Sequence, residues 1–138
     1  MSVTNQPALI SGVDHVAITV ADIDAACQFY ERVLGAYVEE DYKVDGRTIV
    51  RRVMVGKAMF NIHQQGNGVE LVARHPTPGS VDICFRWAGT IDSAIDRLKK
   101  LGIAIIEGPA PRVANDGKAG QSVYFRDPDG NLLELMAT

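Results

Sequence analysis

The chain of 138 residues contains an internal repeat, and this repeat limits what it can fold into. Residues 12–37 read GVDHVAITVADIDAACQFYERVLGAY, and residues 79–104 read GSVDICFRWAGTIDSAIDRLKKLGIA. In each copy, alternating apolar residues precede a helical pattern that ends at Leu-Gly, first at Gly35 and then at Gly102. Two copies of one supersecondary unit predict a fold of two similar modules. The alignment also sets His15 opposite Asp82, two side chains that can bind metal.

Periodicity and turn residues predict four strands and one helix in each module. The expected strands cover residues 14–20, 36–43, 48–55 and 58–64 in the first module and 81–87, 103–107, 121–126 and 132–136 in the second. Asp22 and Thr90 are the expected N-caps of the two helices. Residues 108–120, rich in Gly, Pro and charge, are expected to form a long loop. Each module is then a βαβββ unit whose helix covers one face of its sheet.

Two tandem units of this kind predict an α+β fold. We expect a curved, eight-stranded mixed sheet that surrounds a cleft, with the helices outside. A short N-terminal lead-in would occupy residues 1–11, and a single domain would occupy residues 12–138. Module one would span 12–73, a stiff Pro-rich linker 74–79, and module two 80–137.

Charge and hydropathy argue against several classes of function. The formal net charge is −3 and no basic stripe is present, which argues against nucleic acid as the main partner. No apolar run approaches the length of a membrane span, and the N-terminus lacks the pattern of a secretory signal. Cys27 and Cys84 have neither metal-site nor disulfide spacing. We therefore expect a cytoplasmic protein whose partner is a small molecule.

Strand parity selects the side chains that face the cleft. Successive side chains of a strand point to opposite faces, so residues between the core-facing apolar positions point inward. Four such residues with nitrogen or oxygen donors come from four strands: His15, His63, Asp82 and Glu134. Burying a carboxylate such as Glu134 between two leucines is costly unless it is paired or bound to metal. Three or four of these donors would suit Fe(II), Mn(II), Ni(II), Zn(II) or Co(II).

The same residues allow plainer interpretations. A single His on a strand is usually a hydrogen-bonded structural residue, and Asp82 could cap the connecting turn. Glu134 could pair with Arg52 or Arg86 at the rim, and Arg52 could instead face the cleft and bind an anionic substrate. A metal-free pocket for an amphipathic or aromatic molecule is a further alternative. The inward side chains that would suit such a pocket are Met59, Leu132, Met136 and Tyr124.

The paired units and two motifs resemble the vicinal oxygen chelate superfamily over residues 12–137. The motifs are VDHVAITVADIDAACQFYERVLG in the first module and YFRDPDGNLLEL in the second. This superfamily includes glyoxalase I, fosfomycin-modifying transferases, extradiol dioxygenases, methylmalonyl-CoA epimerase and metal-free bleomycin-binding proteins. The segments FNIHQQG, HPTPGSVDICF and EGPAPR are also similar to a little-characterised branch of glyoxalase-domain proteins, some of them labelled virulence-associated.

The resemblance implies a set of metal ligands. Ligands in this superfamily come from the first, fourth, fifth and eighth strands, which implies His15, Asp82 in place of the common His, and Glu134. The fourth-strand ligand is commonly Glu. Repeat symmetry sets Asn61 at that position, and His63 lies two residues further along the same face.

The resemblance also implies a chemistry. The expected function is a divalent-metal-dependent enzyme that chelates vicinal oxygens of a small-molecule substrate for lyase, isomerase or ring-cleavage reactions. Glu134 would be the catalytic residue that moves a proton. Ring cleavage would use Fe(II) with His15, His63 and Glu134, or with His15, Asp82 and Glu134. The alternative is a metal-free binding protein of the bleomycin-resistance type. A homodimer is implied, with the cleft either within one chain or shared between two.

Overall fold

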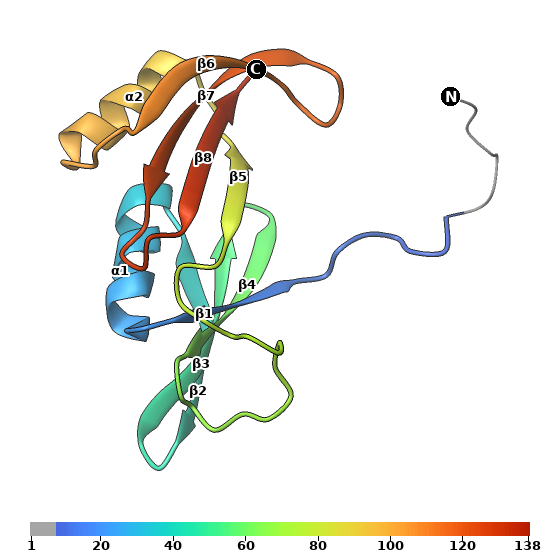
Figure 1. Cartoon of the computed structure of the whole chain (residues 1–138), viewed down its shortest axis with the longest axis vertical. Helices are drawn as coiled ribbons and strands as arrows, with labels where there is room; N and C mark the ends of the chain where they lie inside the picture. The colour runs from blue at the N-terminus through green and yellow to red at the C-terminus, as the bar shows by residue number, and fades with distance from the viewer. Residues whose placement is uncertain (1–7) are drawn as a thin grey trace.

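Ten secondary-structure elements follow one another along the described part of the chain as two βαβββ modules (Figure 1). The computed structural model describes residues 8–138; residues 1–7, which hold most of the expected lead-in, lie outside the described residues. The first module contains β1 (Val16–Val20), α1 (Ile23–Leu34), β2 (Tyr37–Val44), β3 (Arg47–Val55) and β4 (Ala58–Gln64). The second contains β5 (Asp82–Arg86), α2 (Ile91–Lys100), β6 (Glu107–Val113), β7 (Ala119–Arg126) and β8 (Leu132–Ala137).

Hydrogen bonding divides the eight strands into two four-stranded mixed sheets. The strand order is β1-β4-β3-β2 in the first sheet and β5-β8-β7-β6 in the second. In each sheet the pair that includes the first strand of the module is parallel, and the other pairs are antiparallel. Each helix packs against its own sheet, and Figure 1 shows both helices on the same side of the molecule. The predicted α+β fold of two tandem modules is therefore confirmed.

The helices begin where the sequence predicts. The Asp22 side chain accepts hydrogen bonds from the backbone N–H groups of Asp24 and Ala25, and Thr90 accepts one from that of Ser93. Gly35 ends α1 with a φ of 68°, a left-handed conformation in which glycine is unstrained. Within residues 8–138, no helix is both long and apolar enough to cross a membrane.

Burial agrees with most of the predicted strand parity. Alternate side chains along β1, β4 and β8 are buried in the core: Ile18, Val20, Phe60, Ile62, Leu133 and Leu135. The prediction is wrong at two positions, because Val16 is 43% exposed near the free end of β1 and Met136, expected on the inward face, is buried. The intervening side chains lie on the opposite face, which we call the open face of each sheet. Thr19, Asn61, His63 and Glu134 are only half-buried there. Each helix covers the apolar face of its sheet, and the intervening polar side chains therefore lie on the other face.

The chain after α2 differs from the prediction. A strand at 103–107 followed by a loop at 108–120 is wrong, because β6 spans Glu107–Val113 and β7 begins at Ala119. Pro109 and Pro111 are tolerated in β6 because it is the edge strand of its sheet. Ile103 and Ile105 pack against the core but lie before β6 and are not paired as a strand, which explains the apolar alternation there.

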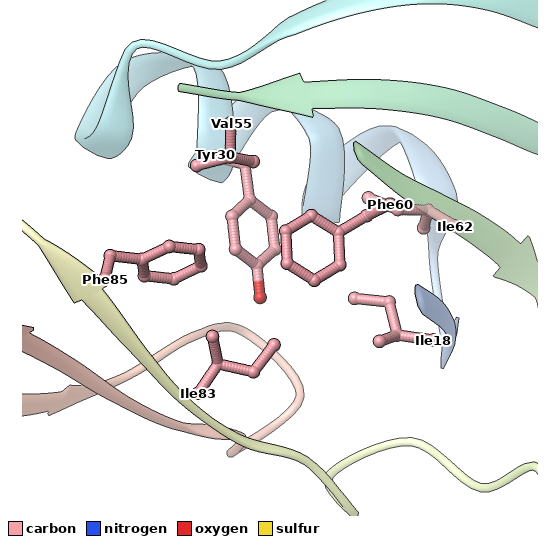
Figure 2. A pocket seen from close by; sticks show the side chains of 7 residues that line it. All are labelled: Ile18, Tyr30, Val55, Phe60, Ile62, Ile83 and Phe85. Carbon is pink, nitrogen blue, oxygen red and sulfur yellow. The ribbon is translucent and has the colours of Figure 1, made fainter. Parts of the chain in front are cut away.

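The two modules share one apolar core. Phe60 packs against Phe85 with ring centroids 6.0 Å apart, and Phe29 packs against Phe125 at 6.4 Å. Figure 2 shows the side chains at this seam, which come from both modules: Ile18, Tyr30, Val55, Phe60, Ile62, Ile83 and Phe85. The space among them does not admit a water molecule. The seam is therefore packed core, and it fixes how the two sheets are oriented.

Candidate functional site

Strand register places the candidate residues at equivalent points of the two sheets. In the first sheet Val16 of β1 is paired with Phe60 of β4, and in the second Ile83 of β5 is paired with Leu133 of β8. Because both pairs are parallel, His15 is equivalent to Asp82 and Asn61 to Glu134. The structure thus supports Asn61 as the fourth-strand equivalent of Glu134, and His63 lies two residues further on.

His15 is held in a form that leaves one nitrogen free. Its Nδ1 lies 2.7 Å from a carboxylate oxygen of Asp14, so Nδ1 carries the proton and donates it. The Nε2 lone pair is then available to a metal ion. A ring nitrogen paired with a carboxylate in this way is the usual support of a metal-binding histidine. The side chain is 43% exposed, so this lone pair is accessible.

His63 is held in the opposite tautomer. The amide nitrogen of Asn67 lies 3.2 Å from Nδ1 of His63 and 2.9 Å from the carbonyl oxygen of Ile49. The Asn67 amide orientation is fixed because its oxygen accepts a hydrogen bond from the Val69 N–H. Nδ1 of His63 is therefore an acceptor and the neutral ring carries its proton on Nε2, which leaves no free lone pair.

The surroundings of His63 also keep it from the charged state. Its ring lines a hollow of about 110 Å³ under the connection between β4 and β5, together with Leu71 and His75. Burial lowers the pKa of His63 below its usual 6.5, because the charged form is poorly solvated there. His63 is thus neutral and structurally bonded in this arrangement.

Asn61 presents an acceptor without a partner. Among the described residues, its Oδ1 is a buried side-chain atom that receives no hydrogen bond, and Nε of the neighbouring Arg52 likewise has no acceptor. Arg52 lies opposite Asn61 on the same open face and is turned toward Glu39 and Glu40, at 3.8 and 3.7 Å. An unsatisfied buried amide oxygen is costly unless something donates to it or is coordinated by it.

Glu134 lies beside a thiol on the open face of the second sheet. Its Cα is paired with that of Cys84 across β5 and β8. Burial raises the pKa of Cys84 to about 11, and the charge of Glu134 and its hydrogen bond with the thiol add to this effect. Arg52 and Arg86 do not pair with Glu134: Arg86 lies 3.5 Å from Asp116 instead. The interpretation of Glu134 as a rim residue paired with an arginine is therefore not supported.

Tyr124 and Arg112 belong to the same open face. Tyr124 is directly opposite Glu134 in the β7–β8 ladder, and its hydroxyl accepts a hydrogen bond of 2.8 Å from Nε of Arg112. The Arg112 guanidinium also lies 5.4 Å from the Tyr124 ring centroid. The sequence gives no signal for Arg112, because its position depends on β6, which composition marks as a loop. The phenol hydrogen of Tyr124 is left to donate to a ligand held near Glu134.

One chain does not bring all the candidate residues together. Within residues 8–138, no group of three or more His, Cys, Asp or Glu side chains is close enough to hold a metal ion. His15 and Asn61 lie with one sheet, and Asp82 and Glu134 with the other. Each open face thus carries half of the donor set. The segment that leads into His15 extends away from the body of the molecule in Figure 1. Its apolar residues Leu9, Ile10 and Val13 are 94%, 77% and 82% exposed.

Comparison with known proteins adds to this geometry. Residues 12–135 match the model of the Glyoxalase/Bleomycin resistance protein/Dioxygenase superfamily. The virulence protein STM3117 of Salmonella typhimurium is 38% identical over 127 residues, which cover 92% of this chain and 84% of that protein. Its crystal structure aligns with a TM-score of 0.81 at 36% identity, over 94% of this chain and 98% of that one.

Two relatives have named activities or ligands. The ethylmalonyl-CoA/methylmalonyl-CoA epimerase of Cereibacter sphaeroides is 30% identical over 132 residues, which cover 92% of this chain and 98% of the epimerase. The fosfomycin resistance protein FosX of Listeria monocytogenes has a structure in complex with Mn(II) and sulfate. It aligns with a TM-score of 0.63 at 25% identity, over 94% of this chain and 91% of FosX.

Proposed function

Because this chain belongs to the glyoxalase/bleomycin resistance protein/dioxygenase superfamily, we propose that it is a divalent-metal-dependent enzyme that moves a proton on a small, oxygen-rich substrate. One observation carries the proposal. Asn61, at the position equivalent to Glu134, holds a buried side-chain oxygen that no group in the described chain satisfies. A cation supplied at this point would satisfy it.

The donor set favours a hard metal ion. His15 offers one imidazole nitrogen, and the other candidates offer oxygen: the amide of Asn61 and the carboxylates of Asp82 and Glu134. Amide and carboxylate oxygens suit Mn(II), and a single imidazole is compatible with it. We therefore place Mn(II) first among Mn, Fe, Co, Ni and Zn. His63 is the candidate that fits least, because its Nδ1 already accepts a hydrogen bond.

We propose that the complete site forms between two copies of the chain. His15 and Asn61 of one copy would meet Asp82 and Glu134 of the other, and the two-fold symmetry of a homodimer would create two such sites. The separation of the two pairs within one chain supports this arrangement. The exposed apolar residues that precede His15 supply surface for the contact.

The residues around Glu134 can carry the proton transfer. A metal ion bound there would act as a Lewis acid on two neighbouring substrate oxygens. Glu134, released from the metal ion or held beside it, would take a proton from the adjacent substrate carbon and return it, which is the role of a general base and acid. Tyr124 would donate its hydroxyl hydrogen to a substrate oxygen, and Arg112 would stabilise the charge that develops.

Ring cleavage fits the site less well than proton transfer. The Fe(II) sites of ring-cleaving enzymes use two histidines and one carboxylate. His15 is available for such a site, whereas His63 is committed to Asn67 by its Nδ1. A set with one histidine, one amide and two carboxylates is better suited to isomerase or lyase chemistry.

Both cysteines support the expected location. Cys27 is a free thiol in the core, and Cys84 is a free thiol on an open face. An exposed thiol persists in a reducing compartment. We propose that the protein acts in the cytoplasm.

The first experiment measures metal binding. The protein is purified without added metal and analysed for elemental content, and apoprotein is then titrated with Mn(II) by calorimetry. We expect stoichiometric binding that Glu134→Gln weakens at least about tenfold, since a carboxylate ligand is lost. Glu107→Gln on the same sheet is the control and should bind like the unmodified chain. Equal affinity in the two variants, or no binding of any of the five metals, would leave the metal-free binding protein as the better interpretation.

The second experiment tests whether the site is shared. His15→Ala and Glu134→Ala chains are each prepared, unfolded together and refolded as a mixture. A shared site predicts that each mixed dimer regains one intact site, because both substitutions fall in the other site. Neither variant should bind Mn(II) alone. If mixing restores no binding while the mixed dimer forms, the site lies within one chain.

A further inference from the structure

A groove at the junction of the two modules has no role in the proposed metal site. Its volume is about 710 Å³, within the range of small-molecule pockets. Leu34 and the turn between β3 and β4 form one wall, and the end of β5 with Trp87 and Ala88 forms the other. Glu134, Asp82, His15 and Asn61 are not among the residues that line it. Cys84, whose Cα is paired with that of Glu134, does line it, so the groove lies next to the candidate metal site but includes none of the proposed ligands.

Trp87, the single tryptophan of the chain, is fixed against this groove. Its Nε1 donates a hydrogen bond of 2.8 Å to Oγ of Ser93, which in turn donates to the carbonyl oxygen of Thr90 at 2.7 Å. A Cβ on Gly89 would lie 2.8 Å from Oγ of Ser93 and 3.0 Å from Nε1 of Trp87, so a side chain there would crowd this hydrogen bond. Because the indole N–H is already satisfied, the ring offers a ligand an apolar surface.

The charge of the groove has one sign. Lys57 and Arg86 are the charged residues that line it, and no carboxylate of residues 8–138 does so. Arg86 is partly engaged by Asp116 at 3.5 Å and by the Thr138 hydroxyl at 2.9 Å. Lys57 makes no ion pair with a described residue and stands on the turn at the mouth of the groove. Its ammonium group is free to meet an anion.

We propose that this groove is a second ligand site, which binds an organic acid with an aromatic or aliphatic body. The body would lie against Trp87, Leu34 and Phe85, and the carboxylate would face Lys57. Apolar walls with one free cation at the mouth match such a molecule. A neutral molecule would leave the cation unused, and a small inorganic anion would leave the apolar walls in water.

The test uses the emission of Trp87. Phenylbutyrate and phenylbutanol share an apolar body and differ in charge, and neither absorbs where tryptophan is selectively excited. Each is titrated into protein supplied with Mn(II), with and without chelator, while the fluorescence emission is recorded. We expect a saturable change with the acid and several-fold weaker binding of the alcohol. Chelator should not alter the acid's affinity, which distinguishes this site from the metal site.

Two lysine variants test whether Lys57 contacts the carboxylate of the bound acid. Lys57→Met should raise the Kd of the acid about fivefold, or about 1 kcal/mol, which is the scale of an exposed ion pair. The same variant should leave the Kd of the alcohol unchanged. Lys43→Met removes a lysine from β2, which does not line the groove, and is expected to bind the acid like the unmodified chain.

Three outcomes would overturn the proposal. The first is an emission that does not respond to the acid at millimolar concentration. The second is equal weakening of acid binding by the Lys57 and Lys43 variants. The third is binding that disappears as protein concentration rises into the range where light scattering reports a dimer, because this would identify the groove as an interface between copies.

Discussion

The hydroxyl of Tyr30 in α1 donates a 2.6 Å hydrogen bond to a carboxylate oxygen of Asp127, in the turn between β7 and β8 of the other module. The same carboxylate accepts from the backbone N–H and the side-chain amide of Asn131, at 2.9 and 2.8 Å. A second link runs from the Ala21 N–H to Asp129 at 2.9 Å. These bonds join the modules beside their apolar seam, so hydrogen bonds as well as apolar packing hold the orientation of the two sheets.

Tyr30→Phe should destabilise the chain by about 1.5–3 kcal/mol, the range for a hydrogen bond to a charged group. The change leaves the ring in place and removes a donor from the buried Asp127 carboxylate. Unfolding in urea, followed by circular dichroism, gives the free energy of unfolding. Tyr42→Phe is a matched control, because its hydroxyl also bonds a carboxylate, that of Glu40, but at the surface. It should cost less than about 0.5 kcal/mol. Equal losses of unfolding free energy in the two variants would show that the Tyr30–Asp127 bond stabilises the chain no more than a surface hydrogen bond does.

Gly79→Ala should be more disruptive than Gly117→Ala. Both glycines have a left-handed φ, of 80° and 84°, so both substitutions carry a backbone strain of about 1–2 kcal/mol. A Cβ at residue 79 would in addition lie 2.6 Å from the carbonyl oxygen of Asp129, whereas nothing lies within 4 Å of one at residue 117. We expect a further loss of about 1–3 kcal/mol at residue 79, measured by thermal or urea unfolding. Similar losses at both sites would contradict this close approach.

Stability should fall with pH below 6.5 through His63. Its folded-state pKa is lowered by burial, so the unfolded chain binds a proton at a higher pH than the folded chain does. The stabilisation is complete above the unfolded pKa of 6.5 and is lost as pH falls through the folded pKa. His63→Gln keeps an acceptor for Asn67 and should flatten the free energy of unfolding between about pH 7 and pH 5. An NMR titration that gives His63 a pKa above 6.5 would refute the prediction.

Cys84 should react slowly with alkylating agents. Its pKa of about 11, against a usual 9.0, reduces the thiolate at neutral pH and should slow its reaction with iodoacetamide about tenfold relative to a thiol of pKa 9.0. The rate should rise about tenfold per pH unit up to about pH 11. Glu134→Gln removes the neighbouring negative charge and should speed the reaction several-fold, with chelator present throughout. Glu107→Gln serves as the control, and Cys84→Ser corrects for reaction at Cys27. An unchanged rate in Glu134→Gln would show that the Glu134 carboxylate does not affect the reactivity of the Cys84 thiol.

The repeat and the strand parity made most of the fold predictable. Apolar residues at every second position and helix caps such as Asp22 and Thr90 are local signals, and burial at Ile18, Phe60 and Leu133 agrees with them. The location of β6 could not be predicted in this way. Pro109 and Pro111 are poor strand residues in general, and only their place at a sheet edge, which is a property of the whole sheet, permits them.

The candidate site could be predicted only in part. Parity correctly puts His63 and Glu134 on open faces, but parity cannot tell which residues of an open face lie near one another. Repeat symmetry predicts Asn61 as the counterpart of Glu134, and the registers of β1 with β4 and of β5 with β8 agree with it. The tautomer of His63 depends on Asn67, a residue outside any strand whose amide is oriented by Ile49 and Val69. No sequence pattern reports such a bond.

The equivalence of His15 with Asp82, and of Asn61 with Glu134, has a consequence for how such a protein can change over time. A duplicated scaffold supplies each donor position twice, on strands with the same register and separate hydrogen-bond ladders. One copy can therefore exchange imidazole for carboxylate, or carboxylate for amide, without disturbing the ladder that supports the other. In a shared site, every such exchange changes the formal charge around a bound ligand by one unit and leaves the backbone unchanged. Divergence within a single chain would then tune preference for metal and substrate gradually, one donor at a time.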